Sequence, residues 1–94
     1  MGQSAVGLVN MIRERAGTTL LNSVTLEELL DERAREFVYE NYRRNDLIRF
    51  GQFHKTWEHK YEESAPYRTI FAIPFQQLEM NDLLVQNPGY PSLP

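Results

Sequence analysis

The chain has 94 residues, 24% of them charged, and a formal net charge of −3 at pH 7. This length allows one domain or a piece of one, with a modest core. A negative net charge argues against non-specific nucleic-acid binding, which needs a positive surface. The absence of cysteine excludes disulfides and thiol chemistry. No run of about 18 apolar residues predicts a membrane span, and the N-terminal sequence does not have the pattern of a signal peptide.

A first helix is predicted over residues 4–16. Its apolar side chains recur near one helical face: Val6, Leu8, Val9, Ile12 and Ala16. Gly17 follows as a C-cap. A short connection of about nine residues then favours antiparallel packing against the next helix.

A second, longer helix is predicted over residues 26–48, and it is the part of the chain around which the rest is organised. Thr25 and Glu28 have the spacing of a capping box. Leucine, alanine, phenylalanine and valine side chains then recur at intervals of three and four residues up to Val38. The apolar pattern weakens at residues 41–45, which indicates that the helix bends or ends there.

The same stretch is rich in arginine and carboxylate side chains that lie within helical reach of each other. Such pairs add only about 0.2–0.5 kcal/mol each on an exposed face, so a solvated, salt-bridged surface is one interpretation. The other is an arginine–carboxylate network that fastens this helix to neighbouring backbone. We predict the second, structural role for four residues among apolar neighbours: Arg43, Arg44, Asp46 and Arg49.

Beyond Gly51 the sequence predicts irregular chain with a short helix at residues 75–81. Residues 52–64 are ambiguous between a short helix and a loop, and residues 67–73 are predicted to be extended. The tail from residue 86 contains Pro88, Pro91 and Pro94, so it cannot form a regular helix or a central strand. Tyr90 is expected to pack the tail against the rest of the chain.

Catalytic and metal sites are not predicted. His54 and His59 lack the spacing of a helical zinc pair. An acidic cluster lies at the start of the long helix: Glu27, Glu28, Asp31 and Glu32. The helix dipole favours negative charge at this end. These residues are not predicted to be the catalytic carboxylate pair of a glycoside hydrolase. No cofactor is expected.

Trp57 and the nearby Tyr61 are weak candidates for ligand contact. Exposed aromatic rings stack on sugars and favour recognition. The lone tryptophan of a small domain more commonly belongs to the core or packs within the chain. Both interpretations of Trp57 stay open at this stage.

Two motifs carry a resemblance to a known family. LLDERAREFVYENYRRNDLIRFGQF, residues 29–53, resembles the C-terminal signature of the SusD/RagB family of outer-membrane nutrient-uptake lipoproteins, with Gln52 where lysine is usual. IFAIPFQQLEMNDLLVQNPGY, residues 70–90, resembles the closing motif of the same family, with Ala72 and Asp82 where proline is common. The motifs stand in the family's order and cover most of the chain.

The resemblance implies a mainly α fold: a helical pair, as at the tetratricopeptide-like end of a SusD-type fold, followed by a loop-rich C-terminal segment. It implies that residues 1–94 are the C-terminal fragment of a SusD-like domain. The whole protein would be a surface-exposed outer-membrane lipoprotein, with its signal and lipid anchor upstream. It would bind oligosaccharide or another nutrient and pass it to a SusC-like TonB-dependent transporter, without enzymatic activity.

The alternative is a helical protein–protein interaction module without a sugar ligand. No glycan-binding residue can be transferred by motif, because the family's sugar contacts usually come from upstream segments. The isolated chain is expected to bind ligand poorly and to expose apolar surface around Val9, Phe37 or Phe50.

Overall fold

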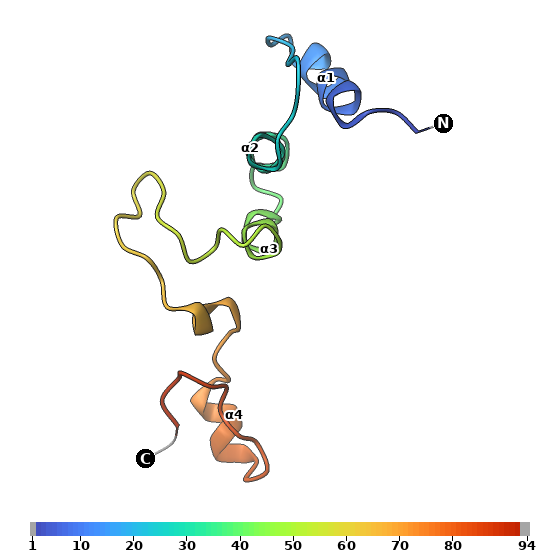
Figure 1. Ribbon diagram of the computed structural model, residues 1–94. Helices are drawn as coiled ribbons and strands as arrows, with labels where there is room; N and C mark the ends of the chain where they lie inside the picture. Colours follow the sequence, from blue (N-terminus) through green and yellow to red (C-terminus); the bar gives the residue numbers. More distant parts are fainter. Residues whose placement is uncertain (1, 93–94) are drawn as a thin grey trace. The chain divides into compact units, whose positions relative to one another are not determined.

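The computed structural model describes residues 2–92, and the chain divides into two compact units, Met1–Gly51 and Gln52–Pro94. The N-terminal unit contains α1 (Ala5–Arg15), α2 (Leu26–Glu36) and α3 (Arg43–Arg49) (Figure 1). The C-terminal unit contains the 3₁₀-helix η1 (Pro66–Thr69) and α4 (Phe75–Met80). The described residues form no β-strand, only an isolated bridge between Trp57 and Lys60. The predicted mainly α class is confirmed.

The ends of the first two helices follow from their capping residues. The Ser4 hydroxyl accepts a hydrogen bond from the Gly7 amide and opens α1. Gly17, with φ +70°, closes it, and the next amide, that of Thr18, donates back to the Arg13 carbonyl. This is the Schellman arrangement, which glycine permits without strain. The capping box of α2 also forms, with the Thr25 amide 2.6 Å from the Glu28 carboxylate.

The prediction of one helix over residues 26–48 is wrong, because the chain reverses between α2 and α3. The break covers residues 37–42, at and before the predicted bend or end at residues 41–45. Tyr39 and Asn41 both have φ +64°, a left-handed conformation that a continuous α-helix excludes. In a straight helix, residues 33 and 46 would lie about 20 Å apart at 1.5 Å per residue. The reversal instead packs α3 against α2 and brings these two side chains into contact.

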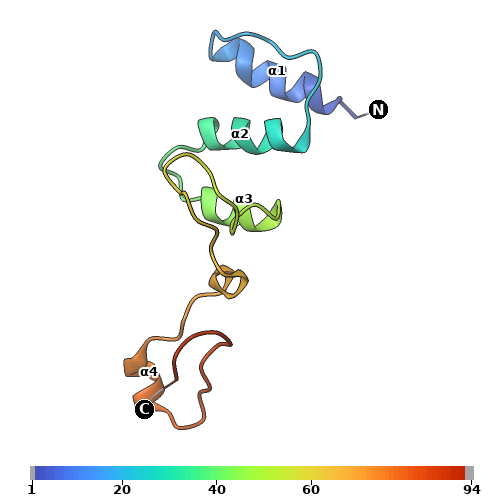
Figure 2. The same cartoon turned by 60° about the vertical axis from the view of Figure 1, so that its left-hand side comes forward.

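The prediction of antiparallel packing for the first two helices is also wrong. Figure 2 shows α1 and α2 running in the same direction, with the connection returning along them. The ion pairs agree, since Arg13 meets Glu32 and Arg15 meets Glu36. Ten extended residues span up to about 33 Å, whereas a helix of 11 residues is only about 16 Å long. The connection is therefore long enough to return to the start of α1.

Polar side chains of α1 hold this returning connection in place. The Asn10 amide group donates to the Leu21 carbonyl and accepts from the Leu21 amide, both at 2.8 Å. The Arg13 guanidinium donates to the Thr19 carbonyl. The two-point contact of Asn10 satisfies both backbone groups of one residue, much as a neighbouring β-strand would.

The apolar core of the N-terminal unit is small. Its buried apolar residues are Val9, Leu30 and Leu47, one from each helix. Val9 itself is only 4% exposed, but its neighbours Leu8 and Met11 are 48% and 58% exposed. Phe37 and Phe50 are half-buried. Large exposed apolar side chains occur elsewhere in the chain: Leu26, Phe71, Met80, Leu83 and Val85.

In the C-terminal unit, Pro66 starts a 3₁₀ turn, so residues 67–69 are not extended as predicted. Proline at the first position of a turn fixes the φ that such a helix needs. The short helix near 75–81 is present as α4, whose Leu78 is the buried apolar residue of this unit. The tail packs back through Tyr90, whose hydroxyl donates to the Ile70 carbonyl at 2.7 Å.

Candidate functional site

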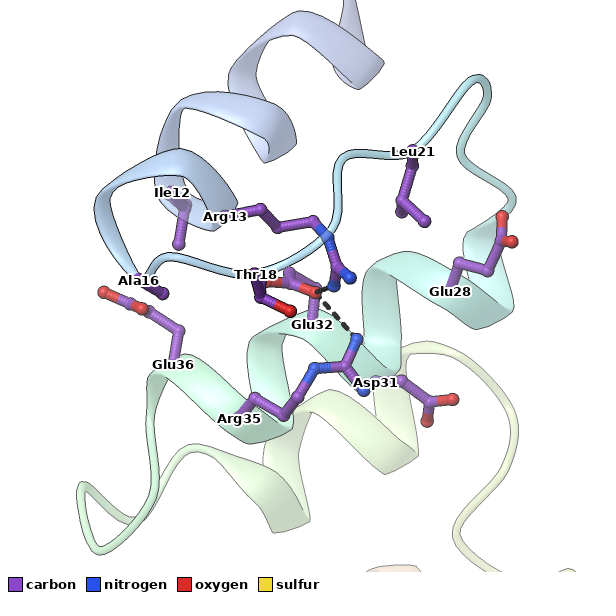
Figure 3. Close-up of a pocket in the computed structure, with 10 residues that line it drawn as sticks. All are labelled: Ile12, Arg13, Ala16, Thr18, Leu21, Glu28, Asp31, Glu32, Arg35 and Glu36. Atoms are coloured by element: carbon purple, nitrogen blue, oxygen red, sulfur yellow. Dashed lines mark hydrogen bonds and ion pairs between the residues drawn. The ribbon is translucent and has the colours of Figure 1, made fainter.

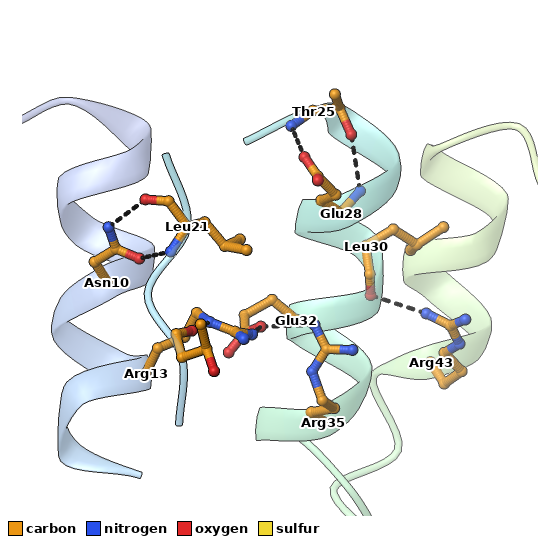
Figure 4. A network of polar contacts seen from close by, with 10 residues as sticks. Asn10, Arg13, Leu21, Thr25, Glu28, Leu30, Glu32, Arg35 and Arg43 are labelled. Atoms are coloured by element: carbon orange, nitrogen blue, oxygen red, sulfur yellow. Dashed lines mark hydrogen bonds and ion pairs between the residues drawn. The ribbon is translucent and has the colours of Figure 1, made fainter. Parts of the chain in front are cut away.

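The carboxylate of Glu32 lies between α1 and α2, where two arginines share it. Arg13 of α1 donates to its Oε2 at 2.8 Å, and Arg35 of α2 donates to the same oxygen at 2.7 Å (Figure 4). Glu32 is only 7% exposed. A buried carboxylate is costly unless it is paired and hydrogen-bonded. This contact therefore fixes how α1 lies on α2.

A cavity of about 510 Å³ opens beside this contact, between α1, the returning connection and α2 (Figure 3). Charged side chains of α2 line one side of it, and the other two segments contribute apolar side chains together with Arg13 and Thr18. Glu32 and Glu28 already serve the ion pairs and the helix cap. The hydroxyl of Thr18 and the carboxylate of Asp31 also line the cavity and offer hydrogen-bonding groups.

A second, smaller cavity of about 280 Å³ lies between α1 and α2 and has a mainly apolar lining. Ala5, Leu8 and Val9 contribute from α1, and Leu29 and Phe37 contribute from α2 and its C-terminal end. Such a surface suits an apolar side chain of a partner rather than a sugar hydroxyl.

Asp46 is the centre of the second buried charge cluster, between α2 and α3. Its Oδ2 accepts from Arg33 Nε at 2.7 Å, and its Oδ1 accepts from Arg49 at 2.9 Å. The Asp46 side chain is 4% exposed, against 29% for Arg33 and 62% for Arg49. Arg43 donates to the Leu30 carbonyl at 3.0 Å (Figure 4).

Arg43, Asp46 and Arg49 thus lie in contacts between α2 and α3 or within α3. Arg44, on the same short helix, is half-buried. That these residues serve structure rather than a ligand stays a prediction, for which the burial of Asp46 is the supporting observation.

Both buried carboxylates are stabilised in their charged form. The pKa of Glu32 lies below its ordinary value, chiefly because Arg35 donates a hydrogen bond to it. Burial opposes this shift, and Arg13 adds to it. The pKa of Asp46 is lowered in the same way, first by the hydrogen bond from Arg33. Burial of Asp46 acts in the opposite direction, and Arg49 adds to the lowering.

Trp57 is 44% exposed and therefore lies outside the core, but it packs within the chain. The ammonium of Lys60 lies 4.1 Å from the centroid of its ring. Tyr61, the other weak candidate, is 83% exposed. The structure places both aromatic residues in the loop before η1, and both keep surface that a ligand can reach.

The acidic cluster at the start of α2 does not converge on one point. Glu28 caps the helix and Glu32 is held by arginines, while Glu27 is exposed at the helix start. His59 Nε2 lies 3.7 Å from the Glu58 carboxylate. Within residues 2–92, no three histidine or acidic side chains are grouped as metal ligands would be. Over the same residues, no helix has the length and apolarity needed to cross a membrane.

Sequence reasoning missed several polar side chains that position the elements. The contacts of Arg13 and Arg33 were not predicted, because their partners lie on other helices and 13 or more residues away. Asn10 was missed because its partner is backbone. Gln86 was missed for the same reason, since its amide bonds both the amide and the carbonyl of Ile73 at 2.9 Å.

These features define a helical segment whose buried charges hold its own helices together and whose aromatic loop is open to solvent. The comparisons with known proteins give its family. The SusD family profile matches residues 2–68, and the chain belongs to this family. Over 98 residues it is 39% identical to Starch-binding protein SusD from Bacteroides thetaiotaomicron. The match covers 95% of this chain and 18% of that protein, so the chain spans less than a fifth of that relative's length.

Proposed function

We propose that this chain is the C-terminal portion of a SusD-like surface lipoprotein that captures oligosaccharides for import through a SusC-like TonB-dependent transporter. The observation that carries the proposal is the 39% identity to a starch-binding protein along nearly the whole chain. Starch oligosaccharides are accordingly the first ligands to test. The relative is named for binding, and we propose a binding function rather than an enzymatic one here too.

The proposed location is the cell surface, at the outer membrane. The residues described here supply helical scaffold, and we place the signal and lipid anchor in an upstream region of the parent protein. The isolated chain should bind glycan weakly, because its aromatic side chains meet a ligand on an open surface rather than in an enclosing pocket.

Calorimetric titration of the full-length parent protein with maltoheptaose and other neutral oligosaccharides tests the proposal. Saturable binding, with no release of reducing ends from polysaccharide, is the expected result. Reducing-end release above the level of a protein-free control would contradict the non-enzymatic assignment. Transporter binding without binding of any oligosaccharide would contradict the glycan-binding role.

Transporter binding without oligosaccharide binding would favour a protein–protein interaction module. One observation supports this second function. The apolar cavity between α1 and α2 could receive a partner's side chain, as helix-binding grooves do. Substituting Leu8 or Leu29, which line this cavity, should then weaken transporter binding while leaving glycan binding unchanged.

A further inference from the structure

We propose that the loop at residues 54–64 is a stacking platform for a neutral pyranose ring, with the indole of Trp57 as its contact surface. The inference rests on the proposed glycan-binding function and assigns to it a site on this chain. It is carried by four observations: the closure of the loop, the fixed position of the indole, its exposure and the charges around it.

The loop is closed by backbone hydrogen bonds, so its tip is held in one conformation. At its base, the Ser64 amide donates to the His54 carbonyl at 2.8 Å. At its tip, the Trp57 amide donates to the Lys60 carbonyl at 3.2 Å, and the Lys60 amide donates back at 2.9 Å. His59, with φ +68°, makes the tight reversal between them. A closed loop of this kind presents its side chains at fixed positions.

Lys60 fixes the indole as well as the backbone. Its Nζ donates to the carbonyls of Phe53, at 3.0 Å, and Lys55, at 2.8 Å, and lies 4.1 Å from the centroid of the Trp57 ring. A cation over an aromatic face is attracted by the ring quadrupole. The indole therefore has a neighbour on one face that orients it, and less rotational freedom remains to be lost on binding.

The exposure of the loop leaves area for a ligand. Trp57 is 44% exposed even with Lys60 in contact, and the neighbouring Tyr61 is 83% exposed. Aromatic side chains supply a large, rigid contact area at a low cost in conformational entropy. The electron-rich face of the indole attracts the C–H groups on one face of a pyranose.

The charges around the loop select the class of sugar. The loop carries three exposed glutamates and two lysines: Glu58, Glu62 and Glu63, and Lys55 and Lys60. Of the two lysines, Lys60 belongs to the loop's own architecture, since its ammonium donates to the carbonyls of Phe53 and Lys55. A uronate or sulfated sugar would approach a surface with excess negative charge. The platform therefore takes neutral rather than anionic sugars.

Trp57 is the only tryptophan of the sequence, so its indole N–H resonance and its fluorescence report on this loop alone. The 94-residue chain is titrated with maltoheptaose and, as the anionic comparison, with pentagalacturonate, up to about 10 mM, a range that covers dissociation constants of about 1 mM. The expected result is a saturable shift of the indole resonance with maltoheptaose and a much smaller shift with the uronate.

Variants of the full-length parent protein then test the role of the ring. Trp57→Ala should weaken maltoheptaose binding about tenfold, the usual scale for losing an aromatic stacking partner. Trp57→Phe should recover part of the loss. The matched control is Phe71→Ala, which removes another exposed ring of the same unit and should leave binding unchanged.

The possible failures are distinguishable. If the parent protein binds maltoheptaose but the indole resonance of the 94-residue chain stays still, or if Trp57→Ala binds as tightly as the wild type, the platform is overturned and the glycan-binding function stands. An equal response to the uronate overturns the selection for neutral sugars. If neither the chain nor the parent protein binds any oligosaccharide, the proposed function and the platform both fail.

Discussion

Replacing Asp46 by alanine should destabilise the N-terminal unit far more than removing an exposed carboxylate. The Asp46 side chain is 4% exposed and accepts hydrogen bonds from Arg33 and Arg49. Its removal leaves the Arg33 guanidinium, itself only 29% exposed, without its carboxylate. Stranding one member of a buried ion pair costs about 3–5 kcal/mol, whereas breaking an exposed pair costs about 0–1 kcal/mol.

The partial exposure of the arginines places the expected loss between these limits. Arg49 is 62% exposed, so its contact with Asp46 contributes little. The bond from Arg33 is charge-assisted and largely shielded from water, and such bonds contribute about 1.5–3 kcal/mol. We therefore expect Asp46→Ala to cost about 2–4 kcal/mol, much of the stability of a small domain.

Thermal unfolding followed by far-ultraviolet circular dichroism measures this loss, with Glu27→Ala as the control. Glu27 is exposed in the first turn of α2, and its removal costs only the helix-dipole contribution of about 0.3–1 kcal/mol. Each kcal/mol lowers the melting temperature by about 4–8 °C in a domain of this size. Equal, small decreases for the two variants would refute the reasoning and assign the motif to contacts with other parts of the parent protein.

Three further predictions concern acid, the tail and the connection. The pKa values of Glu32 and Asp46 are lowered in the folded state. The stability that these carboxylates contribute should therefore be complete above their ordinary pKa values of 4.5 and 3.8, and it should be lost as the pH falls below those values. Urea unfolding between pH 7 and pH 2 measures this loss. Gly89→Ala should disrupt the tail, since φ is +90° and a Cβ would overlap the Tyr67 ring, whereas Gly17→Ala has the φ penalty alone; the ring resonance of Tyr67 reports the difference. Asn10→Ala should cost about 1–3 kcal/mol by leaving both backbone groups of Leu21 unpaired, measured by the same thermal melt.

Local signals predicted three helix ends correctly, each through residues that act on nearby backbone. The capping box of Thr25 and Glu28 and the glycine closure at Gly17 are both present. Pro74 immediately precedes α4, near the predicted start of the short helix. These devices work over three to five residues, so their spacing in the sequence is also their spacing in space.

The errors arise where tertiary contacts override local preference. The apolar pattern weakens at residues 41–45, but it does not show that Tyr39 and Asn41 adopt left-handed backbone, since both residues tolerate a helix. The reversal becomes favourable once Arg33 reaches Asp46 and the rings of Phe37 and Tyr42 meet at 4.9 Å. The direction of α1 relative to α2 was missed for a similar reason, because it depends on side chains that bind backbone beyond their own helix.

The buried charges explain how so small an apolar core specifies one arrangement of three helices. Buried ion pairs are weak evidence for stability, because desolvation offsets much of their attraction. Their hydrogen bonds are directional, however, and a helix that slid along its neighbour would strand Glu32 or Asp46 without partners. Val9, Leu30 and Leu47 could pack in several registers, whereas the carboxylates accept their arginines in one. In this unit the apolar residues supply much of the attraction and the arginine–carboxylate contacts select the register.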